Sequence, residues 1–228
     1  MNSLGLIAER PTETELPRIQ SIREEFDRPA LTGVESVHHE QIHALVQQLF
    51  FAHGSGPRHV GFAAVGPETE TAQLCLEVAT VLAQRGAHDV GLIDGRLQSV
   101  ALHTQLQIPA GNRADESWPI GPRLWLAPRW SWLDDSPGQR IWDPSLARLR
   151  MVTAEFDFSI LCFDPVSWLT ARISQTCEGL VMVLTANKTR RLVATQMQEQ
   201  LQRARVPLLG TVLAERQFPI PPALYRNL

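Results

Sequence analysis

The sequence has little of what marks membrane, nucleic-acid-binding or secreted proteins. No run in its 228 residues approaches the roughly 18 consecutive apolar residues of a membrane-spanning helix. The 21 basic and 24 acidic residues give a formal net charge of -3 and form no basic stripe, so we expect neither nucleic-acid binding nor direct membrane insertion. The N-terminal residues lack a basic segment followed by a long apolar one, so we expect no signal peptide.

Cysteine is scarce as well. Cys75, Cys162 and Cys177 are widely spaced, and each lies in an apolar run, which favours buried free thiols over a metal site or a disulfide. The 44% of apolar and 20% of charged residues are typical of a soluble globular protein. We therefore expect a cytoplasmic protein.

The chain divides into a tail and an α/β domain. Residues 1–35 are rich in proline and charge, which indicates a flexible tail or linker, and 36–228 are long enough for a single domain. After an expected helix at 36–51, short apolar runs alternate with helical patterns, which predicts a mostly parallel sheet with helices on both faces. The expected strands are 59–65, 90–93, 124–127, 158–163, 180–186 and 207–213, and the expected helices are 71–85, 166–176 and 189–205. In the last helix we expect Leu192, Val193, Met197 and Leu201 to share one apolar face.

The first strong strand runs through a turn into a helix, which is the context of a phosphate-binding loop. This stretch is HVGFAAVGPETETAQLCLEVATVLAQRG, and it is followed by VGLIDGRLQSVALHTQL, FDFSILCFDPV, LVMVLTANKTRR and VPLLGTVLAERQFPIPPALYRNL. In this order the segments resemble the CpsD/CapB-type bacterial tyrosine autokinases of polysaccharide biosynthesis, which belong to the MinD/ParA-like P-loop ATPases. The resemblance covers about residues 36–228 and implies a three-layer P-loop NTPase-like fold.

The sequence departs from this family where nucleotide would bind. In the family's loop, glycine amides and a lysine contact the phosphates, and a hydroxyl holds Mg²⁺. Gly66 and Pro67 match the family's loop. The two later glycines, the lysine and the hydroxyl are replaced, in that order, by Glu68, Glu70, Thr71 and Ala72. We expect Thr69 or Thr71 to cap the helix instead.

The two acidic motifs are also altered. The second motif keeps Asp94 but has Arg96 where the family has its second aspartate. The Walker B aspartate corresponds to Cys162, and Asp164 follows two residues later on the same strand face. Because the loss of one transition-state stabiliser costs about 10²–10³ in rate, we expect no catalytic residues, no metal and no nucleotide cofactor.

Three functions remain open at this point. The first is a non-catalytic accessory or regulatory subunit of exopolysaccharide or capsule biosynthesis or export, in a homo- or hetero-oligomer. Its partner would be a membrane polysaccharide co-polymerase or a paralogous intact kinase or ATPase, and the partner would recruit it to the inner membrane. The second is an active ATP-dependent tyrosine kinase or ATPase that binds ATP–Mg²⁺ at an unconventional site, with Asp94, Asp164 or Lys188 as stand-ins. The third is a MinD/ParA-like positioning adaptor.

Four further features bear on metal binding, oligomerisation and partner contacts. His39 and His43 have the spacing of helical zinc ligands, but an interfacial histidine face is favoured because no third ligand is near. The family's Glu-x-x-Arg-x-x-Arg oligomerisation motif corresponds to Glu40, His43 and Val46. The tryptophans at 118, 125, 130, 132 and 142 lie among prolines, and either core packing or partner binding explains them. The single tyrosine, Tyr225, matches the family's Leu-Tyr-Arg position, so we expect no autophosphorylated tyrosine cluster.

Overall fold

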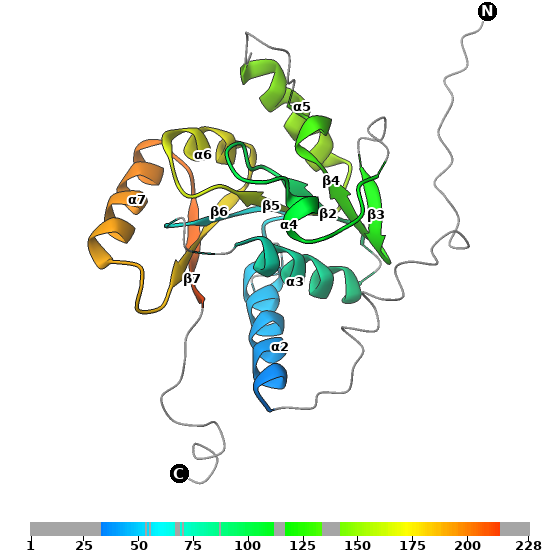
Figure 1. Ribbon diagram of the computed structural model, residues 1–228, viewed down its shortest axis with the longest axis horizontal. Helices are drawn as coiled ribbons and strands as arrows, with labels where there is room; N and C mark the ends of the chain where they lie inside the picture. Colours follow the sequence, from blue (N-terminus) through cyan, green and yellow to red (C-terminus); the bar gives the residue numbers. More distant parts are fainter. Residues whose placement is uncertain are drawn as a thin grey trace, which may run out of the picture.

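The computed structural model describes residues 33–52, 54, 56–66, 69, 71–86, 88–111, 117–133 and 142–214. They form a seven-stranded sheet with the strand order β3-β4-β2-β5-β1-β6-β7. Only the pair of β3 with β4 is antiparallel. Helices lie on both sides of the sheet (Figure 1), so the predicted three-layer α/β fold is confirmed. Apart from residues 33–35, the predicted tail lies outside the described residues.

The six predicted strands are all present, each with ends within one residue of the prediction. A seventh, β3, was not predicted. The strands are β1 (His59–Ala64), β2 (Val90–Asp94), β3 (Trp118–Gly121), β4 (Leu124–Ala127), β5 (Phe158–Phe163), β6 (Gly179–Thr185) and β7 (Leu208–Ala214). β1, β2, β5 and β6 are interior strands covered on both faces, which explains why their sequences are continuous apolar runs rather than alternating ones.

The helices connect the strands as in a doubly wound sheet. They are α2 (Gly33–Val46, extended by a π-helical turn at Gln47–Phe51), α3 (Thr71–Gln84), α4 (Leu102–Gln105), α5 (Trp142–Ala154), α6 (Trp168–Ile173) and α7 (Arg191–Arg203). The predicted helix 166–176 is α6 followed by a 3-10 turn at Ser174–Thr176. α4 and α5 were not predicted.

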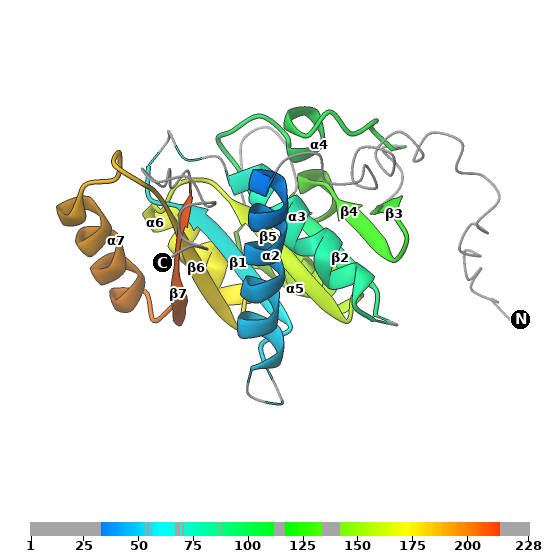
Figure 2. The same ribbon diagram turned by 90° about the horizontal axis from the view of Figure 1, so that it is seen from below.

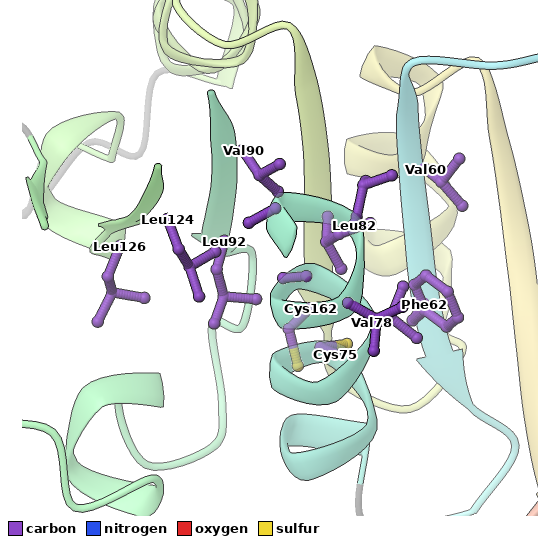
Figure 3. Close-up of a cluster of buried hydrophobic side chains, with 14 of the residues drawn as sticks. Val60, Phe62, Cys75, Val78, Leu82, Val90, Leu92, Leu124, Leu126 and Cys162 are labelled. Carbon is purple, nitrogen blue, oxygen red and sulfur yellow. The ribbon is translucent and has the colours of Figure 1, made fainter. Parts of the chain in front are cut away.

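Two hydrophobic cores hold the layers together, one on each face of the sheet. α2 and α3 cover one face, and α5, α6 and α7 cover the other (Figure 2). Figure 3 shows Val78 and Leu82 of α3 packed over β1 and β2. On the opposite face, Gly61 lets β1 approach the Phe163 ring, since a Cβ atom at Gly61 would lie 2.5 Å from that ring. In the part of the chain that the structure describes, no helix is long and apolar enough to cross a membrane.

The carboxyl ends of the parallel strands meet at one edge of the sheet, here called the carboxyl edge. The segments that lead from β1 to α3, from β2 to α4, from β5 to α6 and from β6 to α7 all lie there. In Figure 2, α4 and the turn that leads into α7 are along the upper edge of the molecule. Open α/β sheets bind their ligands at this edge, so the candidate site is sought there.

Candidate functional site

The segment between β1 and α3 has the geometry of a strand–loop–helix turn. Gly66 is buried at the end of the strand, and its carbonyl accepts a hydrogen bond of 3.2 Å from the Thr69 amide. The Thr69 hydroxyl lies 2.7 Å from the hydroxyl of Thr185, which ends the neighbouring strand β6. The Thr69 side chain thus links the residues before α3 to the end of β6. Pro67, Glu68 and Glu70 lie outside the described residues.

Thr71 and Ala72 begin α3 and are both buried. The Thr71 hydroxyl lies 3.7 Å from the sulfur of Cys162, which is on β5. The contacts described for Thr69 and Thr71 go to other strands, and whether either residue also caps α3 stays a prediction. The positions that hold a lysine and a magnesium-binding hydroxyl in the resembling kinases therefore face a thiol and the protein core.

Cys75 and Cys162 fill the space between α3 and β5. Both thiols are fully buried, share a hydrogen bond and lie next to each other in Figure 3. Burial raises the pKa of Cys75, and the hydrogen bond from Cys75 lowers the pKa of Cys162. Burial also raises the pKa of Cys177 to about 12. The prediction of buried free thiols is confirmed for all three cysteines.

Asp94 is the one aspartate that the chain shares with the acidic motifs of the resembling kinases. Its carboxylate accepts hydrogen bonds from neighbouring residues. Its side chain is 1% exposed, and one carboxylate oxygen accepts hydrogen bonds from the Arg96 amide at 3.2 Å and the Arg96 Nε at 3.3 Å. The other oxygen accepts the Leu102 amide at 2.8 Å, at the start of α4. This carboxylate neutralises Arg96 and orders the segment after β2.

Arg96 is itself buried, with a side chain that is 4% exposed. Its Nη1 donates to Gln105 of α4, while its Nη2 meets no acceptor among the described residues. Arg96, at the position of the second aspartate in the resembling kinases, is therefore a cation inside the protein, and Asp94 serves as its counter-ion. A carboxylate paired in this way is poorly suited to bind Mg²⁺ as well.

The Asp164 carboxylate also accepts hydrogen bonds from within the protein, here from backbone amides of the segment between β2 and α4. Its carboxylate, in a residue that is 7% exposed, accepts the amides of Leu97 at 2.6 Å, Gln98 at 2.8 Å and Ser99 at 3.1 Å. The Ser99 hydroxyl adds a bond of 2.5 Å. Three consecutive amides converge on one carboxylate, as they do around a bound anion. Asp164 thus fixes the β2–α4 segment, a role that the sequence did not reveal.

Lys188, the remaining stand-in candidate, is exposed in the turn after β6. The described motif positions at the carboxyl edge, Thr71, Ala72, Cys162, Asp94 and Asp164, supply a hydroxyl, a methyl group, a thiol and two carboxylates that already accept internal donors. The structure brings Thr71 together with Cys162 and Asp164 together with the β2–α4 segment. None of these contacts forms a phosphate-binding arrangement.

The tryptophans of the proline-rich segment belong mostly to the core. Trp118 and Trp132 are buried, and the Trp132 Nε1 donates to the Asp94 carbonyl at 2.9 Å. Trp118 and Trp130 stack with ring centres 5.8 Å apart. Trp125 is half-buried beside the second core. A partner-binding role for this segment gains no support from Trp118 and Trp132, and the side chain of Trp142 lies outside the described residues.

α2 carries the histidine pair. His39 and His43 approach to 2.9 Å through their Nε2 atoms, and Arg85 donates to the His43 Nδ1 at 3.2 Å. Within the described residues no group of three or more potential metal ligands occurs, so the pair stands without a third ligand. Val46, the last position of the family's oligomerisation motif, is buried in the core beneath α2.

This arrangement makes stability depend on pH. Arginine only donates hydrogen bonds, so the His43 Nδ1 must accept, and neutral His43 carries its proton on Nε2. Burial, His39 and Arg85 all lower the pKa of His43. The unfolded chain therefore binds more protons than the folded one in slightly acidic solution, and stability falls as the pH drops through about 6.5 toward the lower folded pKa.

We expect His43→Gln to flatten this part of the pH dependence, because glutamine can still accept from Arg85 but does not titrate. The measurement is the urea midpoint of both proteins at several pH values from neutral to mildly acidic. The His59 pKa is lowered as well, and this contribution is common to both proteins. If the two midpoints fell in parallel with pH, the proposed role of His43 would be wrong.

The strand order and the helices on both faces define a three-layer α/β fold like that of P-loop NTPases. The chimeric protein CapA2B2 is similar in structure, with a TM-score of 0.65 and 16% identity over 85% of this chain and 89% of that one. The BceF tyrosine kinase domain gives 0.59 and 19% over 85% and 86%. A ParA family ATPase from Chlorobium tepidum gives 0.54 and 16% over 68% and 72%. No family model and no curated protein sequence matches the chain. The fold predicted from the resemblance is thus found in bacterial tyrosine kinase domains and in ParA-type ATPases.

Proposed function

We propose that the protein is a non-catalytic relative of the CpsD/CapB-type tyrosine kinases and acts as an accessory or regulatory subunit in exopolysaccharide or capsule biosynthesis or export. Its structural neighbours include the BceF tyrosine kinase domain and the kinase domain of the Escherichia coli tyrosine kinase ETK, and both share its fold. The role would be exerted through protein contacts, with a membrane polysaccharide co-polymerase or an intact paralogous kinase as partner.

One observation carries the proposal: both remaining carboxylates of the site are engaged inside the protein. Asp94 is paired with Arg96, and Asp164 accepts three backbone amides. A magnesium ion would compete with these donors for the carboxylate oxygens, and each buried donor that it displaced would cost about 1–3 kcal/mol. This also argues against the alternative of an active kinase or ATPase that uses Asp94 or Asp164 as stand-ins.

The test is calorimetric titration of the purified chain with ATP–Mg²⁺ and ADP–Mg²⁺. We expect no binding tighter than a Kd of about 100 μM, because Thr71 stands in place of the loop's lysine and glutamates stand in place of two of its glycines. The BceF kinase domain, measured under the same conditions, serves as the positive control. Tighter binding by this chain, or release of phosphate from ATP above the level of a heat-denatured sample, would overturn the non-catalytic assignment.

A further inference from the structure

Large apolar side chains are exposed near the carboxyl edge of the sheet. Trp168 is 66% exposed, Leu192 is 69% exposed and Leu213 is 51% exposed. They belong to α6, α7 and β7, three neighbouring elements on one side of the molecule. Together with Arg190 and Arg191, these residues are called the α6–α7 surface below.

The topology brings these residues together. α6 follows β5 and α7 follows β6, so both helices start at the carboxyl edge and run toward the opposite edge. There the Gln175 side chain, just beyond α6, donates to the carbonyl of Ala204 at the end of α7, at 2.9 Å. Since the far ends touch and both helices run back from the carboxyl edge, their first turns, with Trp168 and Leu192, both lie toward that edge, and Leu192 is farther along because α7 is the longer helix. Both figures that show the whole fold place α6 beside α7.

Leu213 completes the apolar part of this surface. It is paired in register with Leu184 of β6, which packs on the core beneath α7. Its neighbours Val212 and Ala214 face the opposite core, so by strand alternation Leu213 is on the α7 side of the sheet. It therefore lies at the end of β7, on the side and at the edge where α7 begins.

Local structure keeps the side chains of Trp168 and Leu192 exposed to solvent. The Ser167 hydroxyl accepts the Thr170 amide at 3.2 Å and caps α6, which fixes Trp168 at the first helical position. In α7, Val193 and Met197 pack against the core while Leu192 turns outward. Single exposed apolar residues are ordinary, but a tryptophan and two leucines from three adjacent elements form a patch typical of an interaction site.

The charge beside this patch is positive. Residues 185–195 contain Lys188, Arg190 and Arg191 and no acidic residue, in a protein whose formal net charge is -3. Arg190 and Arg191 are exposed directly before Leu192. The first turn of α7 adds the positive end of a helix dipole. A second copy of this chain would bring like charges together, whereas a segment with acidic and apolar side chains complements both parts of the surface.

We propose that the α6–α7 surface docks an acidic, apolar segment of a protein partner. This inference rests on the proposed function, to which it adds the binding site. Trp168 and Arg191 are of the residue types that dominate binding energy at interfaces.

The experiment is photo-crosslinking of the full chain in cells of its source organism. The photoreactive p-benzoylphenylalanine replaces Trp168 or Leu192, and Gln84, which is exposed at the far end of α3, carries the probe in the control. We expect the first two probes to label the same protein, at a peptide with more acidic than basic residues and with apolar side chains. The Gln84 probe should leave that peptide unlabelled.

A charge reversal, Arg190→Glu with Arg191→Glu, should lower this crosslinking at least about tenfold, because steering and complementarity are lost. Both positions are exposed, so we expect the variant to unfold at the same urea concentration as the parent chain. The proposal is overturned if the adducts are lipids or a second copy of this chain, if the labelled peptide is basic, or if labelling does not exceed that of the Gln84 probe. Failure here with no nucleotide binding leaves the non-catalytic assignment standing, and nucleotide binding with intact crosslinks overturns only that assignment.

Discussion

Replacing Asp164 by alanine should lower the free energy of unfolding by about 4 kcal/mol, a large part of the stability of a domain of this size. The carboxylate accepts three consecutive amides and one hydroxyl from residues 97–99, and Asp164 is almost fully buried. Its removal leaves these donors without an acceptor inside the protein. The effect is measured by urea unfolding followed by tryptophan fluorescence.

Two variants separate this cause from a general loss of packing. Asp164→Asn keeps the volume and one acceptor oxygen, and should cost about half as much as the alanine variant. Ser99→Ala removes only the hydroxyl donor and should cost about 1 kcal/mol or less. If Asp164→Asn were as stable as the parent chain, the charge of the carboxylate would not matter, and the convergence of amides on Asp164 would not explain its burial.

The sheet was predictable from sequence because its interior strands are buried on both faces. Such strands read as continuous apolar runs, and the runs at 158–163 and 180–186 appear as β5 and β6. The helices between them are amphipathic enough to mark their approximate ends. Parallel pairing then follows from the alternation of strands and helices.

The elements that were missed lack these signals. β3 has only four residues, contains Pro119 and pairs at the edge of the sheet, so its pattern is too short to identify. α5 contains a proline, arginines and β-branched residues, and its apolar positions are too few to show a clear stripe. Leu192 was predicted to face the core with Val193 and Met197, but it is exposed, because the core-facing stripe of α7 runs through Val193, Met197 and Leu201, and Leu192 is one position, about 100° of helix rotation, outside that stripe.

The altered site was predictable only in its losses. A sequence shows that Thr71, Ala72 and Cys162 stand at positions where the resembling kinases have a lysine, a hydroxyl and a carboxylate. It does not show what fills the space, because that depends on contacts between residues far apart in the chain. Two examples are the hydrogen bond between Thr69 and Thr185 and the hydrogen bonds from residues 97–99 to Asp164. Each joins residues more than sixty positions apart in the sequence. Such contacts become visible only once the strands are placed side by side.

The pair of Asp94 and Arg96 provides the second large effect. Asp94→Ala should lower the free energy of unfolding by about 4 kcal/mol, because it leaves the buried guanidinium without its counter-ion. Arg96→Met should cost less, about 2 kcal/mol, because the Asp94 carboxylate keeps the amides of residues 96 and 102 as donors. Both variants are measured by urea unfolding at neutral pH.

The double variant decides whether the pair acts as a unit. In the Arg96→Met background, removal of Asp94 leaves no buried cation without a counter-ion. The double variant should therefore lose about 2 kcal/mol less unfolding free energy than the two single variants together. Arg172→Met is the matched control. Its partner Asp143 lies at 2.9 Å but both side chains are largely exposed, and the loss should stay below about 1 kcal/mol. If the losses of unfolding free energy in the two single variants added up to the loss in the double variant, Asp94 and Arg96 would not act as a coupled ion pair.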